Sequence, residues 1–169
     1  MGFVHLHAHS QFSILDGTIL PSRLAALAAE NGMPAVAQTD VVNLFGAVTF
    51  YKACKASGIK AILGAELHVQ PEGRAFEDPY REEGGFQIIA LVENEQGYLN
   101  LCELITKAIY DGVQYKPRID FKDLASHSEG LIILTGGRKG VFREWHGDVF
   151  KSDPTESWFE ALCQVFPVG

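Results

Sequence analysis

The 169-residue sequence has few cysteines, a deficit of positive charge and no long run of apolar residues. No segment reaches the roughly 20 apolar residues that a membrane-spanning helix needs. Residues 1–7 lack the basic and apolar regions of an export signal. The three cysteines, Cys54, Cys102 and Cys163, form no CxxC pair. We therefore expect buried free thiols in a soluble, cytoplasmic protein without a membrane partner.

The shortage of basic residues also limits the possible contacts with nucleic acid. The chain has 14 Lys and Arg residues against 21 Asp and Glu residues, which gives a net charge of −7. A domain that holds DNA by its phosphates is expected to present a basic surface. We therefore expect any link to DNA to be indirect, through a partner, a small active site or the rest of a longer polypeptide.

Short apolar segments alternate along the chain with longer segments of helical period. The predicted strands are residues 3–7, 35–39, 59–63 with 67–69, 87–92 and 131–134. The predicted helices are residues 21–31, 44–57, a helix capped by Asn94 that runs to about Tyr110, a short helix from near Asp120, and residues 157–165. The polar residues 71–85 are predicted to form a surface excursion.

This alternation predicts an α/β fold with mostly parallel strands. The strands are almost continuously apolar, which indicates burial on both faces beneath covering helices. The length favours a single domain over residues 1–169. The predicted strands are too few for a closed (β/α) barrel, which usually takes ~250 residues. A barrel would therefore be incomplete at its C-terminal end.

Histidines cluster at the end of the first predicted strand. His5 and His7 are two residues apart, so on a strand both imidazoles point to one face and can reach one metal ion. His9 follows in the loop and adds a third imidazole. Taken alone, such a pattern is weak, and two unrelated surface histidines are the better explanation.

Carboxylates follow the same and the next two predicted strands. Asp16 lies in an Asp-Gly turn, where capping or bending the chain is the usual role. Asp40 closes the second strand, where helix capping or loop hydrogen bonding would also explain it. Glu66 interrupts an otherwise apolar segment, which is harder to explain by structure alone. Mixed imidazole and carboxylate sets bind divalent ions that activate water for phosphoester hydrolysis. Together these residues favour a metal site.

Four segments carry a resemblance to a known family. HLHAHSQFSILDG is similar to the first motif of PHP (polymerase and histidinol phosphatase) domains. AQTDVVNLFGAVTFYKACKASGIKAILGAEL, VENEQGYLNLCELIT and GLIILTGGRKG resemble the following segments of the PHP domains of bacterial DNA polymerase III alpha subunits. The resemblance covers nearly the whole chain. It implies a distorted (β/α) barrel of the PHP type.

The resemblance also implies a set of metal ligands. Catalytically competent PHP domains bind up to three ions through His, Asp, Glu and Cys side chains. By that resemblance His5, His7, Asp16 and Glu66 occupy ligand positions here.

Three other ligand positions depart from the family pattern. Val41 and Gln87 stand where histidines are expected, and Gly137 stands where a Cys or His is expected. The final Asp-x-His motif of the family would lie beyond residue 169. Valine and glycine offer no donor atom, and a glutamine carbonyl is a poor ligand for zinc-like ions. We therefore expect at most one weakly held divalent ion (Zn, Mn or Mg).

Two functions follow from the resemblance. In the first, the chain is a structural and partner-binding module in DNA replication, and its partners are the polymerase body of the same chain and, in some bacteria, the proofreading exonuclease subunit. Nucleotidyltransferase activity would then belong to the parent polymerase. In the second, it is a metal-dependent phosphoesterase, either a 3′–5′ exonuclease or a small-molecule phosphatase, with Asp16 or Asp40 as candidate catalytic residues. The sequence leaves open whether the domain is itself an enzyme.

Overall fold

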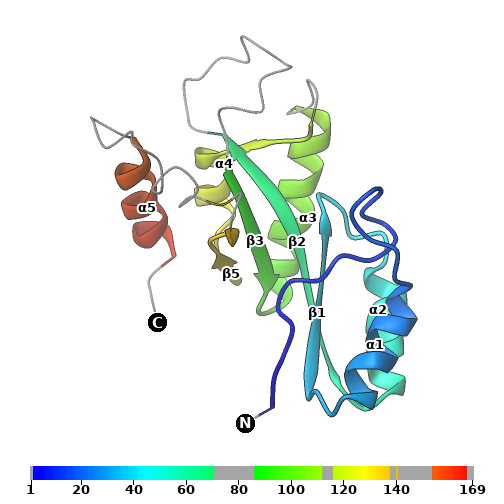
Figure 1. Cartoon of the computed structure of the whole chain (residues 1–169). Helices are drawn as coiled ribbons and strands as arrows, with labels where there is room; N and C mark the ends of the chain where they lie inside the picture. The colour runs from blue at the N-terminus through cyan, green and yellow to red at the C-terminus, as the bar shows by residue number, and fades with distance from the viewer. Residues whose placement is uncertain (1, 71–85, 112–115, 138–139, 141–153, 167–169) are drawn as a thin grey trace.

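The computed structural model describes residues 2–70, 86–111, 116–137, 140 and 154–166 (Figure 1). The predicted surface excursion at residues 71–85 lies outside these ranges. Within them, no helix is both long and apolar enough to cross a membrane.

Five strands form one mixed sheet, whose order is β1-β2-β3-β5, with β4 paired to β2. The strands are β1 (Ala35–Val41), β2 (Lys60–Gln70), β3 (Phe86–Val92), β4 (Ile119–Asp120) and β5 (Leu131–Leu134). β2 pairs in parallel with β1 and with β4, whereas β3 is antiparallel to both β2 and β5. All strands except β3 therefore run in one direction, which confirms a mostly parallel α/β fold. The described strands do not close into a barrel.

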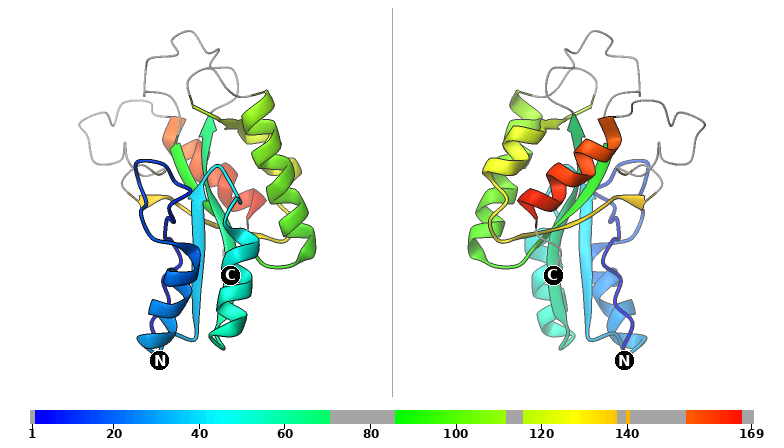
Figure 2. Two further views of the ribbon diagram at one scale, coloured as in Figure 1. Left: turned by 90° about the vertical axis from the view of Figure 1, so that its right-hand side faces the viewer. Right: turned by 90° about the vertical axis from the view of Figure 1, so that its left-hand side faces the viewer.

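Five helices connect and cover these strands (Figures 1 and 2). They are α1 (Pro21–Glu30), α2 (Ala47–Ala56), α3 (Glu95–Tyr110), α4 (Phe121–Ser126) and α5 (Pro154–Val165). The Asn94 side chain accepts a hydrogen bond from Gly97 N and so caps α3, as predicted. Asp120 caps α4 in the same way, by accepting from Asp123 N. α2 begins three residues later than expected, because Asn43 Oδ1 accepts from Phe45 N in the preceding turn.

Register divides the side chains of the sheet between two faces, because successive residues of a strand point in opposite directions. Leu67 lies opposite Ile88 on one face, and both belong to the core that includes residues of α3. Val36 lies on the same face and packs with residues of α1 and α2. We call this the helix face. The opposite face carries Thr39 and Glu66, and we call it the site face.

The strand predicted at residues 3–7 is not present. The segment instead follows the free edge of β1, where Ala37 N donates to His5 O and Thr39 N donates to Ala8 O. Two steps along β1 thus correspond to three steps along the segment. The extra residue breaks the regular register of a strand pair, as in a β-bulge. The N-terminal segment is therefore an irregular strip beside β1.

Asp40 fastens the next part of this segment to the sheet. Its buried carboxylate accepts hydrogen bonds from Ser10 N at 2.6 Å, Ser10 Oγ at 2.7 Å, Ser13 Oγ at 2.7 Å and Gln38 Nε2 at 2.6 Å. Each carboxylate oxygen therefore has two donors, which satisfies the charge of a group removed from water. Of the two structural roles considered for Asp40, loop hydrogen bonding is the one that it performs.

We predict that Asp40→Asn lowers the free energy of unfolding by about 2–4 kcal/mol, because an amide NH2 would face donors where an oxygen accepts. Urea unfolding measures the change. Glu30→Gln is the matched control, because it removes a carboxylate that makes only an exposed ion pair with Arg23, and it should cost less than ~1 kcal/mol. Equal effects of the two substitutions would contradict a structural role for Asp40.

A second prediction concerns Cys54, which is fully buried between α2 and the sheet. Burial raises the pKa of its thiol to about 11. We expect iodoacetamide at pH 8 to modify the partly exposed Cys102 well before Cys54, because only the thiolate reacts. Mass spectrometry of peptides from the native chain measures both rates. Modification of Cys54 as fast as Cys102 would contradict the burial of the thiol.

Candidate metal centre

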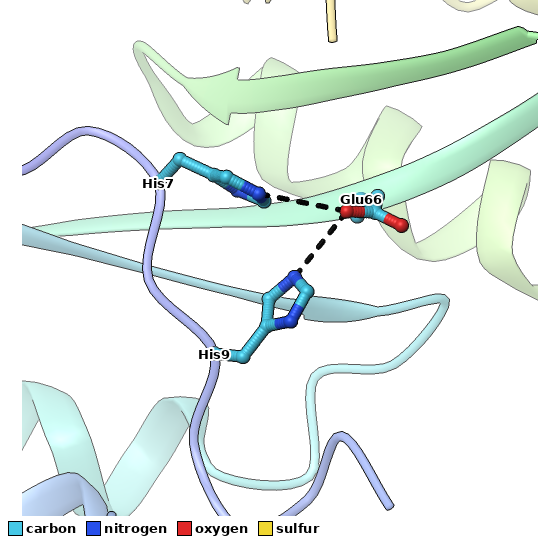
Figure 3. A group of neighbouring side chains, drawn as sticks. All are labelled: His7, His9 and Glu66. Carbon is cyan, nitrogen blue, oxygen red and sulfur yellow. Dashed lines mark ion pairs between the residues drawn. The ribbon is translucent and has the colours of Figure 1, made fainter. Parts of the chain in front are cut away.

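The candidate site lies where the N-terminal segment passes the carboxyl end of β1 and reaches over β2 (Figure 3). Neighbouring residues of this segment contact side chains on opposite faces of the sheet. His9 approaches Glu66 on the site face, whereas Ser10 binds Asp40, which points to the helix face. The hydrogen bonds to Asp40 therefore also fix the position of His9.

His7, His9 and Glu66 form a compact group whose ligand atoms all lie within 4.8 Å of one another. His7 Nε2 is 3.6 Å from Glu66 Oε2, and His9 Nε2 is 3.3 Å from the same oxygen. Figure 3 shows both rings directed at the carboxylate. The Glu66 side chain is 8% exposed, whereas that of His7 is 43% exposed. The group is therefore anchored in the sheet and open to solvent on the His7 side.

Thr39 orients the ring of His7. The Thr39 hydroxyl accepts a hydrogen bond from Ala8 N and donates one to Ala8 O, and His7 Nδ1 lies 3.0 Å from the same oxygen. A hydroxyl has one proton and two lone pairs. Its proton and one lone pair are used by Ala8, so the remaining lone pair accepts from Nδ1–H of His7. This assignment leaves the lone pair of Nε2 directed at Glu66.

The three groups influence one another's ionisation. Burial lowers the pKa of His7, and the charge of His9 lowers it further. The contact with Glu66 raises the pKa of His9 despite its burial. Burial alone would raise the pKa of Glu66, but the close contact with His9 and the charges of His9, His68 and His7 outweigh it, so its pKa is lowered. Glu66 is thus held as a carboxylate between imidazoles, the state in which it binds a cation.

The geometry of this group fits a divalent ion. The buried Nε2 of His9 has no well-directed hydrogen bond within the described part of the chain, although it lies close to Glu66. In a tetrahedral site with bonds of about 2.0–2.1 Å, ligand atoms are roughly 3.3–3.4 Å apart. Glu66 Oε2 lies 3.3 Å from His9 Nε2 and 3.6 Å from His7 Nε2, and both distances are close to that separation. Two imidazoles and a carboxylate are also the donor set of catalytic zinc sites.

The structure brings together two of the four predicted ligands, His7 and Glu66. The third member is His9, which the sequence had marked only as a further imidazole. His5 is exposed and places its ring against Phe3, outside the group. His5-x-His7 and His7-x-His9 have the same spacing, so the sequence alone could not choose between them. The hydrogen bonds from Ala8 and Ser10 to β1 determine which histidines lie beside Glu66.

The predicted carboxylates Asp16 and Asp40 do not join the group. Asp16 is exposed in the turn after Ser13, where its charge still contributes to the raised pKa of His9. Asp40 lies on the opposite face, and its oxygens are occupied by the bonds described above.

The three positions that depart from the family pattern do not belong to the group. Val41 lies opposite Glu66 in register and packs against the core. Gln87 lies opposite His68 on β3. Gly137 follows β5 with a φ of +58°, and an added Cβ there would meet open space.

Comparison with known proteins places this site in a family. The family model of the PHP domain matches residues 5–168. The DNA polymerase III subunit alpha of Treponema pallidum is 49% identical over 137 residues, which cover 80% of this chain and 12% of that protein. The corresponding subunit of Aquifex aeolicus is 39% identical over 170 residues, covering 97% of this chain and 15% of that protein. The chain thus spans only a small part of these relatives.

A solved structure supports the fold. A two-domain protein from Bacteroides vulgatus, containing a predicted PHP-like metal-dependent phosphoesterase, matches with a TM-score of 0.55. The match covers 95% of this chain and 40% of that chain, at 18% sequence identity. The family match over residues 5–168 and the identity to the two alpha subunits show that the chain belongs to the PHP domain family.

Proposed function

We propose that this chain is the PHP module of a DNA polymerase III alpha polypeptide, in which it braces the polymerase body and serves DNA replication in the cytoplasm. The observation that supports this most is the identity of 39–49% to alpha subunits over most of the chain. The net charge of −7 fits a module that contacts other protein rather than duplex DNA. A proofreading exonuclease subunit is a further partner consistent with this role.

His7, His9 and Glu66 would hold one divalent ion in this module. Imidazole ligands favour zinc or manganese over magnesium, which prefers oxygen donors and its own water shell. A bound ion would act as a Lewis acid towards a phosphoester and lower the pKa of a coordinated water. The chain supplies the rest: Thr39 orients His7, the bonds to Asp40 position His9, and the sheet holds Glu66.

Three other positions support a site with room for only one ion. Val41 occupies the position level with Glu66 on the neighbouring strand and offers no donor. Gly137 offers none either, and Gln87 offers only an amide. A second or third ion would therefore lack ligands within the described chain, which supports weak phosphoesterase activity at most.

A second candidate function, metal-dependent phosphoester hydrolysis by the domain itself, is favoured by one specific observation. The three-ligand group is compact and open to solvent on the His7 side, as a catalytic rather than a structural metal site would be. Asp16 is the exposed carboxylate beside His9 that could take part in proton transfer.

We predict that the metal-free chain binds about one equivalent of Zn²⁺ or Mn²⁺. His9→Ala should weaken binding by at least about 100-fold, because it removes one of three ligands. Isothermal titration with elemental analysis measures stoichiometry and affinity. His5→Ala is the matched control, and it should bind as the wild type does, because His5 lies outside the group.

Two results would contradict this assignment. If His5→Ala lost metal binding and His9→Ala kept it, the ligands would be His5 and His7 and not His7 and His9. Two or three tightly bound ions per wild-type chain would show that ligands other than these three residues take part.

The role in the polymerase is tested in the complete polypeptide. We predict that the encoding gene continues into a polymerase and that Asp40→Asn lowers the temperature at which polymerase activity is lost, by roughly 5 °C or more. His9→Ala, which removes a metal ligand and not the Asp40 bonds, should leave that temperature unchanged. If Asp40→Asn destabilises the isolated segment but not the polymerase activity, the segment does not brace the polymerase body.

A further inference from the structure

Two large apolar side chains form the tip of the turn that precedes α1. Ile14 is 82% exposed and Leu15 is 100% exposed. The turn is closed by two hydrogen bonds to the carbonyl oxygen of Ser13, from Asp16 N at 3.0 Å and from Gly17 N at 2.9 Å. The hydroxyl of Ser13 is in turn hydrogen-bonded to a buried carboxylate of β1. The tip is therefore fixed to the sheet, and its apolar side chains have a defined position.

The backbone of Leu15 is unfavourable for its residue type. Its φ of +77° lies in the left-handed region, which glycine and asparagine adopt far more readily than leucine. Because the side chain is fully exposed, no packing within the described part of the chain offsets this strain. Backbone strain of this kind is found most often where a protein binds or acts on another molecule. The fold alone does not explain a leucine at this position.

The start of α2 adds further apolar surface next to this turn. Phe45 is 73% exposed and Val48 is 63% exposed. The rings of Phe45 and Phe12 meet edge to face, with centroids 6.3 Å apart. Asn43 Nδ2 also donates a hydrogen bond of 3.1 Å to Phe12 O. The loop that carries the tip and the start of α2 therefore pack against each other. The apolar surface, as we call it, comprises Ile14, Leu15, Phe45 and Val48.

Positive charge borders the apolar surface. Lys52 and Lys55 are exposed and follow Val48 by four and seven residues, so they lie on the same side of α2. Residues 41–65 contain no Asp or Glu, although the whole chain has a net charge of −7. A complementary surface would therefore be apolar at its centre and acidic at its border.

The size of the apolar surface indicates which occupant it can hold. Four side chains exposed to this extent offer on the order of 600 Å². Each partner in a stable complex of separate chains contributes about 800 Å². Contacts between domains of one polypeptide can be smaller, because the tether supplies a high effective concentration. The alpha subunits that resemble this chain are far longer, and the match to that of Treponema pallidum covers 12% of its length. These observations favour a tethered occupant over a second copy.

We propose that Ile14, Leu15, Phe45 and Val48 dock this chain onto the remainder of its own polypeptide, at an apolar area with an acidic border. The proposal rests on the proposed function for the identity of that polypeptide. It adds which surface makes the contact and which chemistry the contact has. Docking buries the side chain of Leu15 and so offsets the strain of its backbone.

Cysteine labelling of the complete polypeptide tests the contact. Leu15→Cys and Val48→Cys place a thiol in each part of the apolar surface, whereas Glu30→Cys places one at the exposed C-terminal end of α1. Maleimide labelling followed by mass spectrometry of peptides measures the rate at each position, in the complete polypeptide and in the 169-residue chain. We expect both surface positions to react at least about tenfold more slowly in the complete polypeptide, because a tethered contact is formed most of the time. Glu30→Cys should react equally fast in both forms.

A substitution at the strained position separates docking from folding. Leu15→Asn suits the left-handed φ and removes the apolar side chain. The urea midpoint of the 169-residue chain should therefore stay the same or rise. In the complete polypeptide the same substitution should speed the labelling of Val48→Cys at least about threefold, because the contact is weakened. Leu99→Asn is the matched control: it removes an exposed leucine of α3 and should leave that rate unchanged.

The outcomes distinguish this proposal from the proposed function. Equally fast labelling of Leu15→Cys and Val48→Cys in both forms would overturn the docking surface, even if Asp40→Asn lowers the temperature at which polymerase activity is lost. Slow labelling of both positions in the complete polypeptide, with no effect of Asp40→Asn on that temperature, would support docking and contradict bracing. Labelling of the 169-residue chain that slows as its concentration rises would identify a second copy as the occupant and overturn the tethered contact.

Discussion

The structure depends on the buried carboxylate of Asp40, which four donors surround on the helix face of the sheet. These bonds fasten an irregular N-terminal segment to an edge strand that would otherwise lack a partner on that side. Thr39, the preceding residue, points to the opposite face and orients His7. One pair of adjacent strand residues therefore sets both the path of the segment and the direction of an imidazole.

The same alternation gives the sheet two distinct uses. Along β2 and β3 its helix face is apolar and supplies the core with α3, whereas its site face carries polar residues at intervals of two near the end of β2. Glu66 and His68 are two of them; Gln87 of β3 lies level with His68, and the N-terminal segment brings His7 beside Glu66. The candidate ligands are thus gathered on one face of the sheet.

Local signals in the sequence predicted much of this arrangement. The cap at Asn94 and the start of a short helix near Asp120 are confirmed, because a side chain that bonds its own helix start needs no distant partner. The predicted strand at residues 3–7 was wrong, because only the bonds to β1 reveal the extra residue in that segment. The structure places His9 rather than His5 beside Glu66, and the equal spacing of the three histidines along the chain could not predict this, because the bonds to β1 position the rings. The level position of His68 and Gln87 follows from strand register, which residue spacing does not encode.

His7, His9 and Glu66 are proposed to bind one ion together. X-ray absorption spectroscopy of the chain loaded with one equivalent of Zn²⁺ can decide this, because scattering from the imidazole rings counts the histidine ligands. We expect two imidazoles, with the remaining ligands oxygen. Three imidazoles would mean that a histidine from outside the group takes part, and none would place the ion elsewhere; either result would refute the assignment.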